Sequence, residues 1–439
     1  MATNSWQSAL LRSKLFWALV SVPVIGLVTF ICNWYAQRSL VDAKLAELRA
    51  NGLPTTASEV DDFYVVPDGV TDTTNLWVAA IDAVRTADLS TRGKTLPIIG
   101  NGSTRVPPPG EPWAELEASR TLLGELDKEL QLIYRAAAAG GQIRFPTNYS
   151  AGMPPPFFDI GTTIEVSDLL KLGAHVSAHD GDDERTLQDL TAIFALSDAM
   201  RDEPSGVSQM VRRAFHSIGS YHVERLLPHC RWNDAKLQSL QVAIGSAQFK
   251  DELSNAVCGE RAFCLSMLDD MTLGPSRQAN KLAALRFFGS SIEGYAEPWP
   301  AALQKQREIN AEITRLEDGK VSCIRLKGVL LIMPAFSGID GARVTARQRC
   351  AIAGIATQRH WLKHGRLPNS LAEIDAELLG DSSEPSVQLT DPFNGQPLRY
   401  MMEETRVVIY SVGSNQQDDG GHCGLKTREP RDVGFTLKR

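Results

Sequence analysis

Several short motifs that identify common enzyme classes are missing from this chain of 439 residues. It has no Gly-x-Ser-x-Gly turn of a serine hydrolase, no phosphate-binding Walker loop and no Gly-x-Gly-x-x-Gly dinucleotide loop. No two of its seven cysteines have the Cys-x-x-Cys spacing of a zinc ribbon or a thioredoxin-type site. The motif-defined forms of these classes are therefore excluded, and no reaction is indicated.

The chain also lacks a basic region. Its 45 Lys and Arg residues are outnumbered by 52 Asp and Glu residues, and its net charge is −7. No run of Lys and Arg is interleaved with aromatic residues, as a surface for phosphate backbones requires. We therefore expect no nucleic acid among its partners.

One long apolar run is present near the N-terminus, over residues 15–35. It meets the length of roughly 20 residues that a membrane-spanning helix needs. Trp17, Trp34 and Tyr35 lie near its ends, where amphipathic rings prefer the membrane interface. The alternative is a cleaved signal peptide, but a cleavage site ending at Ala36 would place the large Trp34 where a small residue is needed. We predict an uncleaved anchor that contacts the lipid bilayer, preceded by a short cytoplasmic tail, residues 1–14.

The charges that flank the anchor do not decide its orientation. Positive residues lie on both sides, namely Arg12 and Lys14 before it and Arg38, Lys44 and Arg49 after it. One cysteine, Cys32, lies inside the anchor. The other six are compatible either with disulfides in an oxidising compartment or with buried thiols.

Residues 36–320 have the apolar spacing of helices, with repeats of three and four residues. The spacing predicts one helix over 116–133 and a succession of antiparallel helical hairpins over about 164–315. Stretches rich in Pro and Gly, near 96–113 and 140–158, predict loops. The expected fold class is mainly α.

The last hundred residues, 340–439, have a different character. A helix is expected from Val344 to His364, ended by Gly365, because glycine readily adopts the left-handed conformation of a helix stop. Arg406–Tyr410 has the β-branched composition of a strand and can pair with 398–401 across a turn. These features predict a small α+β domain, a helix followed by an antiparallel sheet.

In this region a Gly-x-x-Pro turn at Gly365, an Asp-Pro-aromatic segment at Asp391 and a Ser-x-Gly turn at Ser411 follow one another. Their order resembles the globular domain of the type II secretion major pseudopilins. The resemblance implies a calcium ion in the loop after the Ser-x-Gly turn. Carried onto this chain, its ligands would include Asn415, which replaces the usual Asp, and Asp418 or Asp419.

The chain departs from that family at its N-terminus. The anchor lacks the Gly-Phe-Thr-Leu-x-Glu processing site, and a large helical region separates it from the similar segment. We therefore do not expect the chain to polymerise into a pseudopilus. The whole layout resembles uncharacterised single-pass bacterial envelope proteins, which implies a place in the inner membrane with the main body, including 36–320 and 340–439, outside the cytoplasm.

Two histidine pairs, His175 with His179 and His360 with His364, have the four-residue spacing that puts both rings on one helical face. Zinc ligation uses this spacing. However, the Glu that follows the first histidine in metalloproteases is replaced by Val176 in one pair. Surface or capping histidines are the competing interpretation.

Three functions are compatible with these patterns. The favoured one is a membrane-anchored envelope protein that binds another envelope protein or polymer without catalysis. The alternatives are an accessory component of a type II secretion or pilus-like machine, and a metal-dependent hydrolase that uses one histidine pair. The hydrolase would need a carboxylate and a third ligand near the two rings.

Overall fold

The computed structural model describes residues 14–102, 106–151, 159–318, 338–380, 385–423 and 431–438. Most of them are helical, which confirms the expected mainly α fold class. The longer described helices are α2 (Lys14–Ala50), α3 (Ala57–Phe63), α4 (Thr74–Ala87), α6 (Leu116–Glu125), α7 (Asp127–Ala139), α8 (Ile160–Asp180), α9 (Asp183–Ala199), α10 (Gly206–Leu226), α11 (Asp234–Gly245), α12 (Phe249–Asp270), α13 (Arg277–Ala296), α14 (Ala301–Asp318) and α16 (Ile339–His364). Shorter helical segments are α5 (Leu89–Arg92), α17 (Pro385–Gln388) and the 3-10 turns η1 (Tyr149–Ala151), η2 (Gly274–Ser276), η4 (Leu371–Glu373) and η5 (Ala376–Leu379).

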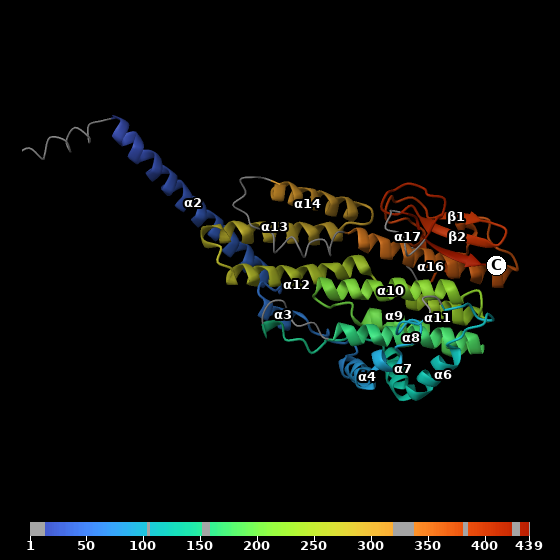
Figure 1. Ribbon diagram of the computed structural model, residues 1–439. Helices are drawn as coiled ribbons and strands as arrows, with labels where there is room; N and C mark the ends of the chain where they lie inside the picture. Colours follow the sequence, from blue (N-terminus) through green and yellow to red (C-terminus); the bar gives the residue numbers. More distant parts are fainter. Residues whose placement is uncertain are drawn as a thin grey trace, which may run out of the picture.

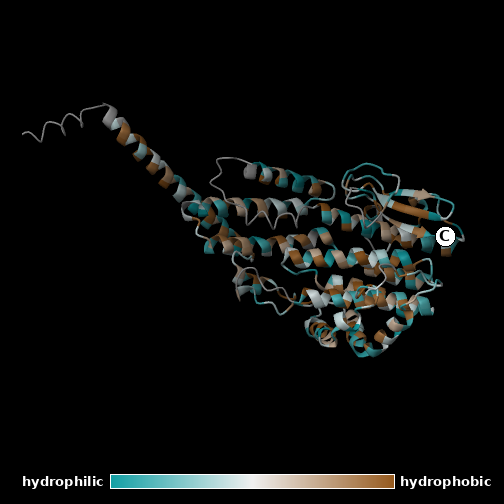
Figure 2. Cartoon of the chain, viewed as in Figure 1, coloured by the Kyte–Doolittle hydropathy of each residue, from teal (hydrophilic) through white to brown (hydrophobic). Residues whose placement is uncertain are grey.

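Helix α2 projects from the body as a single continuous rod (Figure 1). Its apolar outer part has exposed side chains, among them Val22, Ile25 and Leu27 (Figure 2). By length and composition it is the described helix that can cross a membrane. At its other end Val41 is buried with Leu265 of α12 and Leu285 of α13, so the rod is fixed to the body by an apolar contact.

The middle of the chain forms helices that run back and forth beside one another (Figure 1). Helices α8 and α9 are joined at Gly181, whose φ of 73° gives the left-handed stop, and Asp182 caps α9 by accepting the amide N–H of Arg185. The single helix predicted over 116–133 is wrong, because the chain bends at Leu126 and divides it into α6 and α7. Leu126 is only 1% exposed, so the bend keeps it in the core.

The two predicted loops differ in how they pack. The described part of 96–113 contains no helix or strand, yet Leu96, Val106 and Trp113 are buried in the core that α4, α7 and α8 share. This stretch is a strap with inserted side chains. The described part of 140–158 has one short 3-10 turn, η1, whose Tyr149 is buried. The other loop residues of that range, 152–158, lie outside the described chain.

Near the C-terminus three strands form an antiparallel sheet in the order β1 (Arg399–Met402), β2 (Arg406–Ser411) and β3 (Val433–Lys438). Tyr400 pairs with Ile409, and Ile409 pairs with Phe435 on the other side. The predicted helix and hairpin are thus confirmed, with α16 ending at Gly365, whose φ is 69°. The sheet packs on α16 at one end of the molecule (Figure 1).

One apolar core crosses the boundary between the two predicted domains. Phe194 of α9 and Leu240 of α11 belong to the same buried cluster as Ile355 of α16 and Phe435 of β3. Helix α16 therefore lies between the helical array and the sheet and packs against both. Any hollow along α16 is walled by segments far apart in sequence.

Candidate functional site

The predicted calcium ligands lie in the loop that follows β2. Asn415 donates from Nδ2 to Asp419 Oδ2 at 3.0 Å, so these two side chains meet. Asp418 is used elsewhere, because its Oδ1 accepts from Tyr410 Oη at 3.0 Å and from the Gly420 amide. Ion ligation by all three would require these contacts to rearrange, and calcium at this loop stays a prediction.

The loop also contains a carboxylate that the sequence did not single out, Asp432. Its two oxygens accept the amide N–H groups of Asp419 and Gly421, which ties the loop to the start of β3. Burial raises the pKa of Asp432, and the two amide bonds oppose that rise. Within the described ranges no three His, Cys, Asp or Glu side chains are arranged to hold a metal ion.

The first histidine pair separates in the fold. His175 is 1% exposed, and its Nε2 lies 2.8 Å from Nδ1 of His222 on α10. His179 instead donates from Nε2 to the carbonyl of Pro107 in the strap, at 3.1 Å. Burial lowers the pKa of His175 to about 3, assisted by Arg225, so the ring is neutral at ordinary pH. The contact partner of His175 is thus on another helix, not one turn away.

The second histidine pair stays together at the end of α16. The ring centroids of His360 and His364 are 4.3 Å apart, and His364 Nε2 lies 3.1 Å from Asp375 Oδ2. His360 is 2% exposed, and neither of its ring nitrogens has a hydrogen-bond partner among the residues that the structure describes. Burial lowers its pKa, with a further contribution from His364. Two rings and one carboxylate are near one another here, and zinc at this pair stays a prediction.

A larger feature lies where the helical array meets α16. A cavity of about 800 Å³ opens between α11, the start of α12, the end of α13 and α16, a size typical of ligand sites. We call it the junction cavity. Its described lining comprises Gln241, Val242, Gly245, Ser246, Ala247, Gln248, Phe249, Lys250, Ala296, Pro298, Trp299, Thr345, Gln348, Arg349, Ile352, Leu379, Gly380, Val387, Gln388 and Thr390.

Buried glutamines fix the walls of the junction cavity. Gln348 of α16 donates from Nε2 to the carbonyls of Ile244 and Ala247, at 2.8 and 2.9 Å, and so satisfies the end of α11. Gln241 of α11 donates to the carbonyls of Ile352 and Leu378, at 3.1 and 2.8 Å. Because both glutamines are nearly fully buried, breaking these bonds would leave orphaned polar groups.

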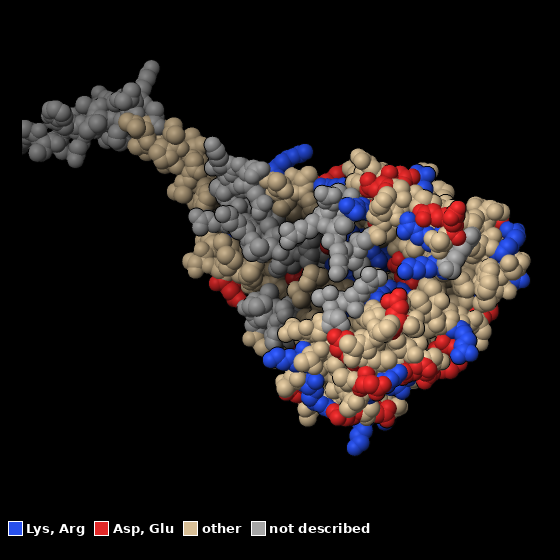
Figure 3. Space-filling model, turned by 45° about the vertical axis from the view of Figure 1, so that its right-hand side comes forward, with Lys and Arg blue, Asp and Glu red and all other residues tan. Residues whose placement is uncertain are grey.

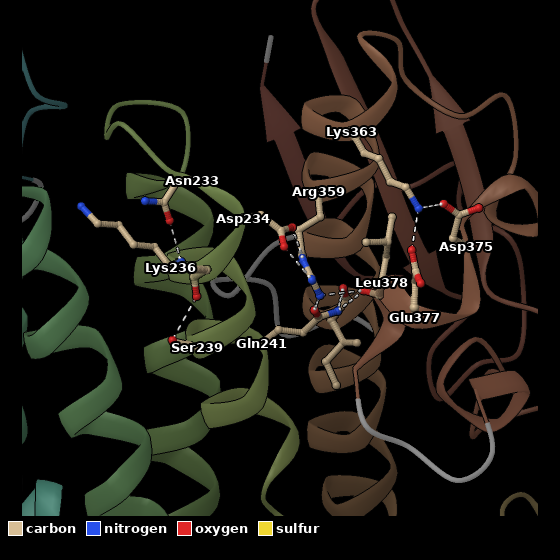
Figure 4. A network of polar contacts seen from close by, with 12 residues as sticks. Asn233, Asp234, Lys236, Ser239, Gln241, Arg359, Lys363, Asp375, Glu377 and Leu378 are labelled. Carbon is tan, nitrogen blue, oxygen red and sulfur yellow. Dashed lines mark hydrogen bonds and ion pairs between the residues drawn. The ribbon is translucent and has the colours of Figure 1, made fainter.

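An ion pair between α16 and α11 also stabilises this wall. Arg359 of α16 lies between two side chains of α11, as Figure 4 shows. Its Nε and Nη2 donate to the carboxylate of Asp234 at 2.7 and 3.1 Å, and its Nη1 donates to Gln241 Oε1 at 2.9 Å. This bidentate pairing fixes the spacing of α11 and α16, and with it the width of the cavity.

The charged residues of the described cavity lining are both cations. Lys250 donates from Nζ to the carbonyl of Tyr295 at 2.8 Å, and Arg349 donates from Nη1 to the carbonyl of Thr390 at 2.6 Å. Burial lowers the pKa of Arg349 to about 10, and Asp391 partly opposes this. Even so the guanidinium is charged at neutral pH, and the described lining presents two positive charges, Lys250 and Arg349.

A second hollow, of about 460 Å³, lies on the other side of α11, against α7 and α9. Eight of its sixteen described lining residues are Ala or Gly, namely Ala136, Ala137, Ala138, Gly140, Gly141, Ala192, Ala195 and Ala243, and the others include Tyr134, Gln188, Thr191, Asp198, Ser239 and Ser246. We call it the alanine trough. It shares Val242 and Ser246 with the junction cavity, so the two hollows meet over the outer face of α11.

Acidic and basic side chains are intermixed over the face seen in Figure 3.

Comparison of the chain with protein-family models, with curated protein sequences and with solved structures found no match. Geometry and sequence are therefore the basis for a functional assignment. One sequence signal for the cavity exists, because Gln241 interrupts the apolar face that Leu237, Leu240 and Ile244 form on α11.

Proposed function

We propose that this chain is a single-pass protein of the bacterial inner membrane that binds a partner molecule, without catalysis, through the junction cavity. The observation that carries the proposal is the cavity itself. It is large, its walls are held by buried amides and an ion pair, and its described lining combines aromatic, amide and cationic groups. Preformed walls of this kind favour binding because less order is lost when a ligand enters.

Membrane attachment is supported by α2. An apolar surface that is exposed along most of a helix is costly in water and favourable in a bilayer. Trp34 and Tyr35 lie where the apolar part ends, and their rings are 5.0 Å apart. The body then begins within a few turns, at Val41. We place the body outside the cytoplasm on the sequence resemblance of its C-terminal part.

The second candidate, an accessory component of a type II secretion or pilus-like machine, is favoured by the C-terminal architecture. Helix α16 packs on a three-stranded antiparallel sheet, in the order that the pseudopilin resemblance implies. The Asp-Pro-aromatic segment is also ordered, since the carboxylate of Asp391 accepts from Phe393 N, Ser411 Oγ and Val412 N. In this view the chain contributes the C-terminal unit to an assembly.

Membrane extraction and ligand capture together test the proposal. The full chain should stay with the membrane after carbonate extraction. A bulky Thr345→Trp substitution, in the cavity wall, should abolish binding of the partner while Arg343→Trp, on the exposed side of α16, should not. Release of the chain by carbonate, or equal binding by both variants, would contradict the proposal. A secretion or pilus defect caused by Met402→Arg, at an exposed position of β1, and not by Thr345→Trp would favour the second candidate.

A further inference from the structure

We infer that the ligand of the junction cavity is an extended polypeptide segment with acidic residues at one end and small or apolar residues at the other. This inference rests on the proposed function and names the chemical class of its ligand. It is carried by the charge of the junction cavity, the composition of the alanine trough, and the contact of the two over α11.

The acidic end follows from Arg349 and Lys250. Among the described lining residues of the cavity there is no Asp or Glu. No described carboxylate lies within 4.0 Å of the Arg349 guanidinium, and Asp391, whose charge acts on Arg349, already accepts three hydrogen bonds. A guanidinium offers five N–H groups, of which the bond to Thr390 uses one. A carboxylate of the ligand would satisfy more of them in a bidentate geometry.

The apolar end follows from the alanine trough. Ala137, Ala195 and Val242 present methyl groups, against which small apolar side chains of a peptide would lose water at a gain. Gln188, Thr191 and Ser239 of the same wall can bond the polar groups of a peptide backbone. An extended polypeptide supplies both kinds of group in one chain.

The path between the two ends runs over α11. Val242 is 52% exposed and belongs to both walls, so a ligand that occupies both hollows must pass over it. An extended chain can do this, since it advances roughly 3.3 Å per residue. Its acidic end then reaches the cavity while its apolar end lies in the trough.

The test uses the full chain in lipid nanodiscs and a fluorescein-labelled peptide of sequence Ala-Val-Ala-Leu-Ala-Glu-Asp-Glu. Comparison peptides have Lys in place of the acidic residues, or Ser in place of the apolar ones, and polygalacturonic acid is the glycan probe. Fluorescence anisotropy should give saturable binding of the first peptide alone, weakened by salt. Saturable binding of the Lys peptide, or of polygalacturonic acid alone, would overturn the inference.

Paired variants test where on the protein the peptide binds. Arg349→Gln and Lys250→Gln should each weaken binding about tenfold or more. Because Val242 is exposed, its substitution leaves the core intact, and Val242→Glu should weaken binding while Val242→Lys strengthens it. The matched control Arg286→Gln, an exposed residue of α13 paired with Glu312, should change nothing. Equal affinity of the Val242 variants would overturn the inference, as would an unchanged Arg349→Gln.

Carbonate extraction of the chain from membranes distinguishes failure of this inference from failure of the proposed function. A chain that stays in the membrane but binds no peptide would refute the ligand class and would still agree with a membrane anchor.

Discussion

Replacing Gly354 by alanine tests how closely α16 lies on the sheet. A Cβ at this position would come within 2.4 Å of Cδ1 of Phe435 on β3. Phe435 is 1% exposed, so its ring has little room to move. Alanine favours a helix over glycine by about 1 kcal/mol. Overpacking of a filled core costs about 1–3 kcal/mol. Because a contact of 2.4 Å is far shorter than ordinary packing, we expect the upper part of this range, about 2–3 kcal/mol. Gly354→Ala should therefore lower the free energy of unfolding by about 1–2 kcal/mol.

Gly289→Ala on α13 is the matched control. Outside its own helical turn, no described residue has an atom within 4 Å of the added Cβ, so the gain in helix preference decides and the free energy of unfolding should rise by about 0.5–1 kcal/mol. The two variants should therefore differ by about 2–3 kcal/mol. From the usual unfolding entropy per residue, this corresponds to about 2–3 °C in Tm for a chain of this length.

The assay is thermal unfolding of both variants of the full chain, followed by a double variant. Phe435→Leu shortens the side chain that Gly354→Ala meets, so the two changes together should be less destabilising than their sum. If Gly354→Ala stabilises the protein as much as Gly289→Ala, or if the double variant is additive, α16 and β3 do not touch as described.

Three further predictions concern the core, the cavity wall and the anchor. Burial raises the pKa of Glu260 to about 7 from 4.5, while its bond to Gly206 N opposes the rise. The folded state therefore binds more protons than the unfolded chain between these values, and stability falls as pH rises through this window. Glu260→Gln keeps an acceptor for Gly206 and should be more stable at pH 8 by up to about 3 kcal/mol, with no difference at pH 4 in urea unfolding. Arg359→Met leaves Gln241 Oε1 buried without its donor and should lower the free energy of unfolding by about 2–3 kcal/mol. The control Arg343→Met removes an exposed ion pair and should lower it by at most about 0.5 kcal/mol. Equal denaturant midpoints for the two variants would contradict the role of Arg359. Ile25→Arg with Val28→Arg adds about 2.5–3.5 kcal/mol per charge to membrane insertion, so carbonate should release this variant and not the original chain.

Local features of this fold were predictable because short stretches of chain determine them. The end of α16 at Gly365 follows from the left-handed conformation that glycine adopts, and Asn233 caps α11 by accepting the amide N–H of Lys236. The hairpin of β1 and β2 follows from strand composition around a charged turn. In each case the deciding contacts lie within a few residues.

The predictions that were wrong or missing concern features that depend on contacts between segments far apart in the sequence. The bend at Leu126 is invisible in the apolar spacing, because α6 and α7 each keep that spacing. His175 pairs with His222, 47 residues away, in preference to His179. The junction cavity depends on Gln241 and Gln348, whose bonds to the opposite helix span 111 and 104 residues. No local pattern specifies such distances, although a lone glutamine on an apolar helical face was a signal for buried hydrogen bonding.

The central claim is that α2 anchors the chain and holds its body outside the cytoplasm. Labelling with a membrane-impermeant maleimide in intact bacteria tests it most directly. One reporter cysteine is placed either at Gln131, which is exposed on α7, or at Ala2, in a chain whose Cys32, Cys230, Cys323 and Cys423 are replaced by serine; Cys258, Cys264 and Cys350 are buried. We predict labelling at position 131 in intact cells and at position 2 only after lysis. Labelling in the reverse order would contradict the orientation, and recovery of the chain in the soluble fraction would contradict the anchor.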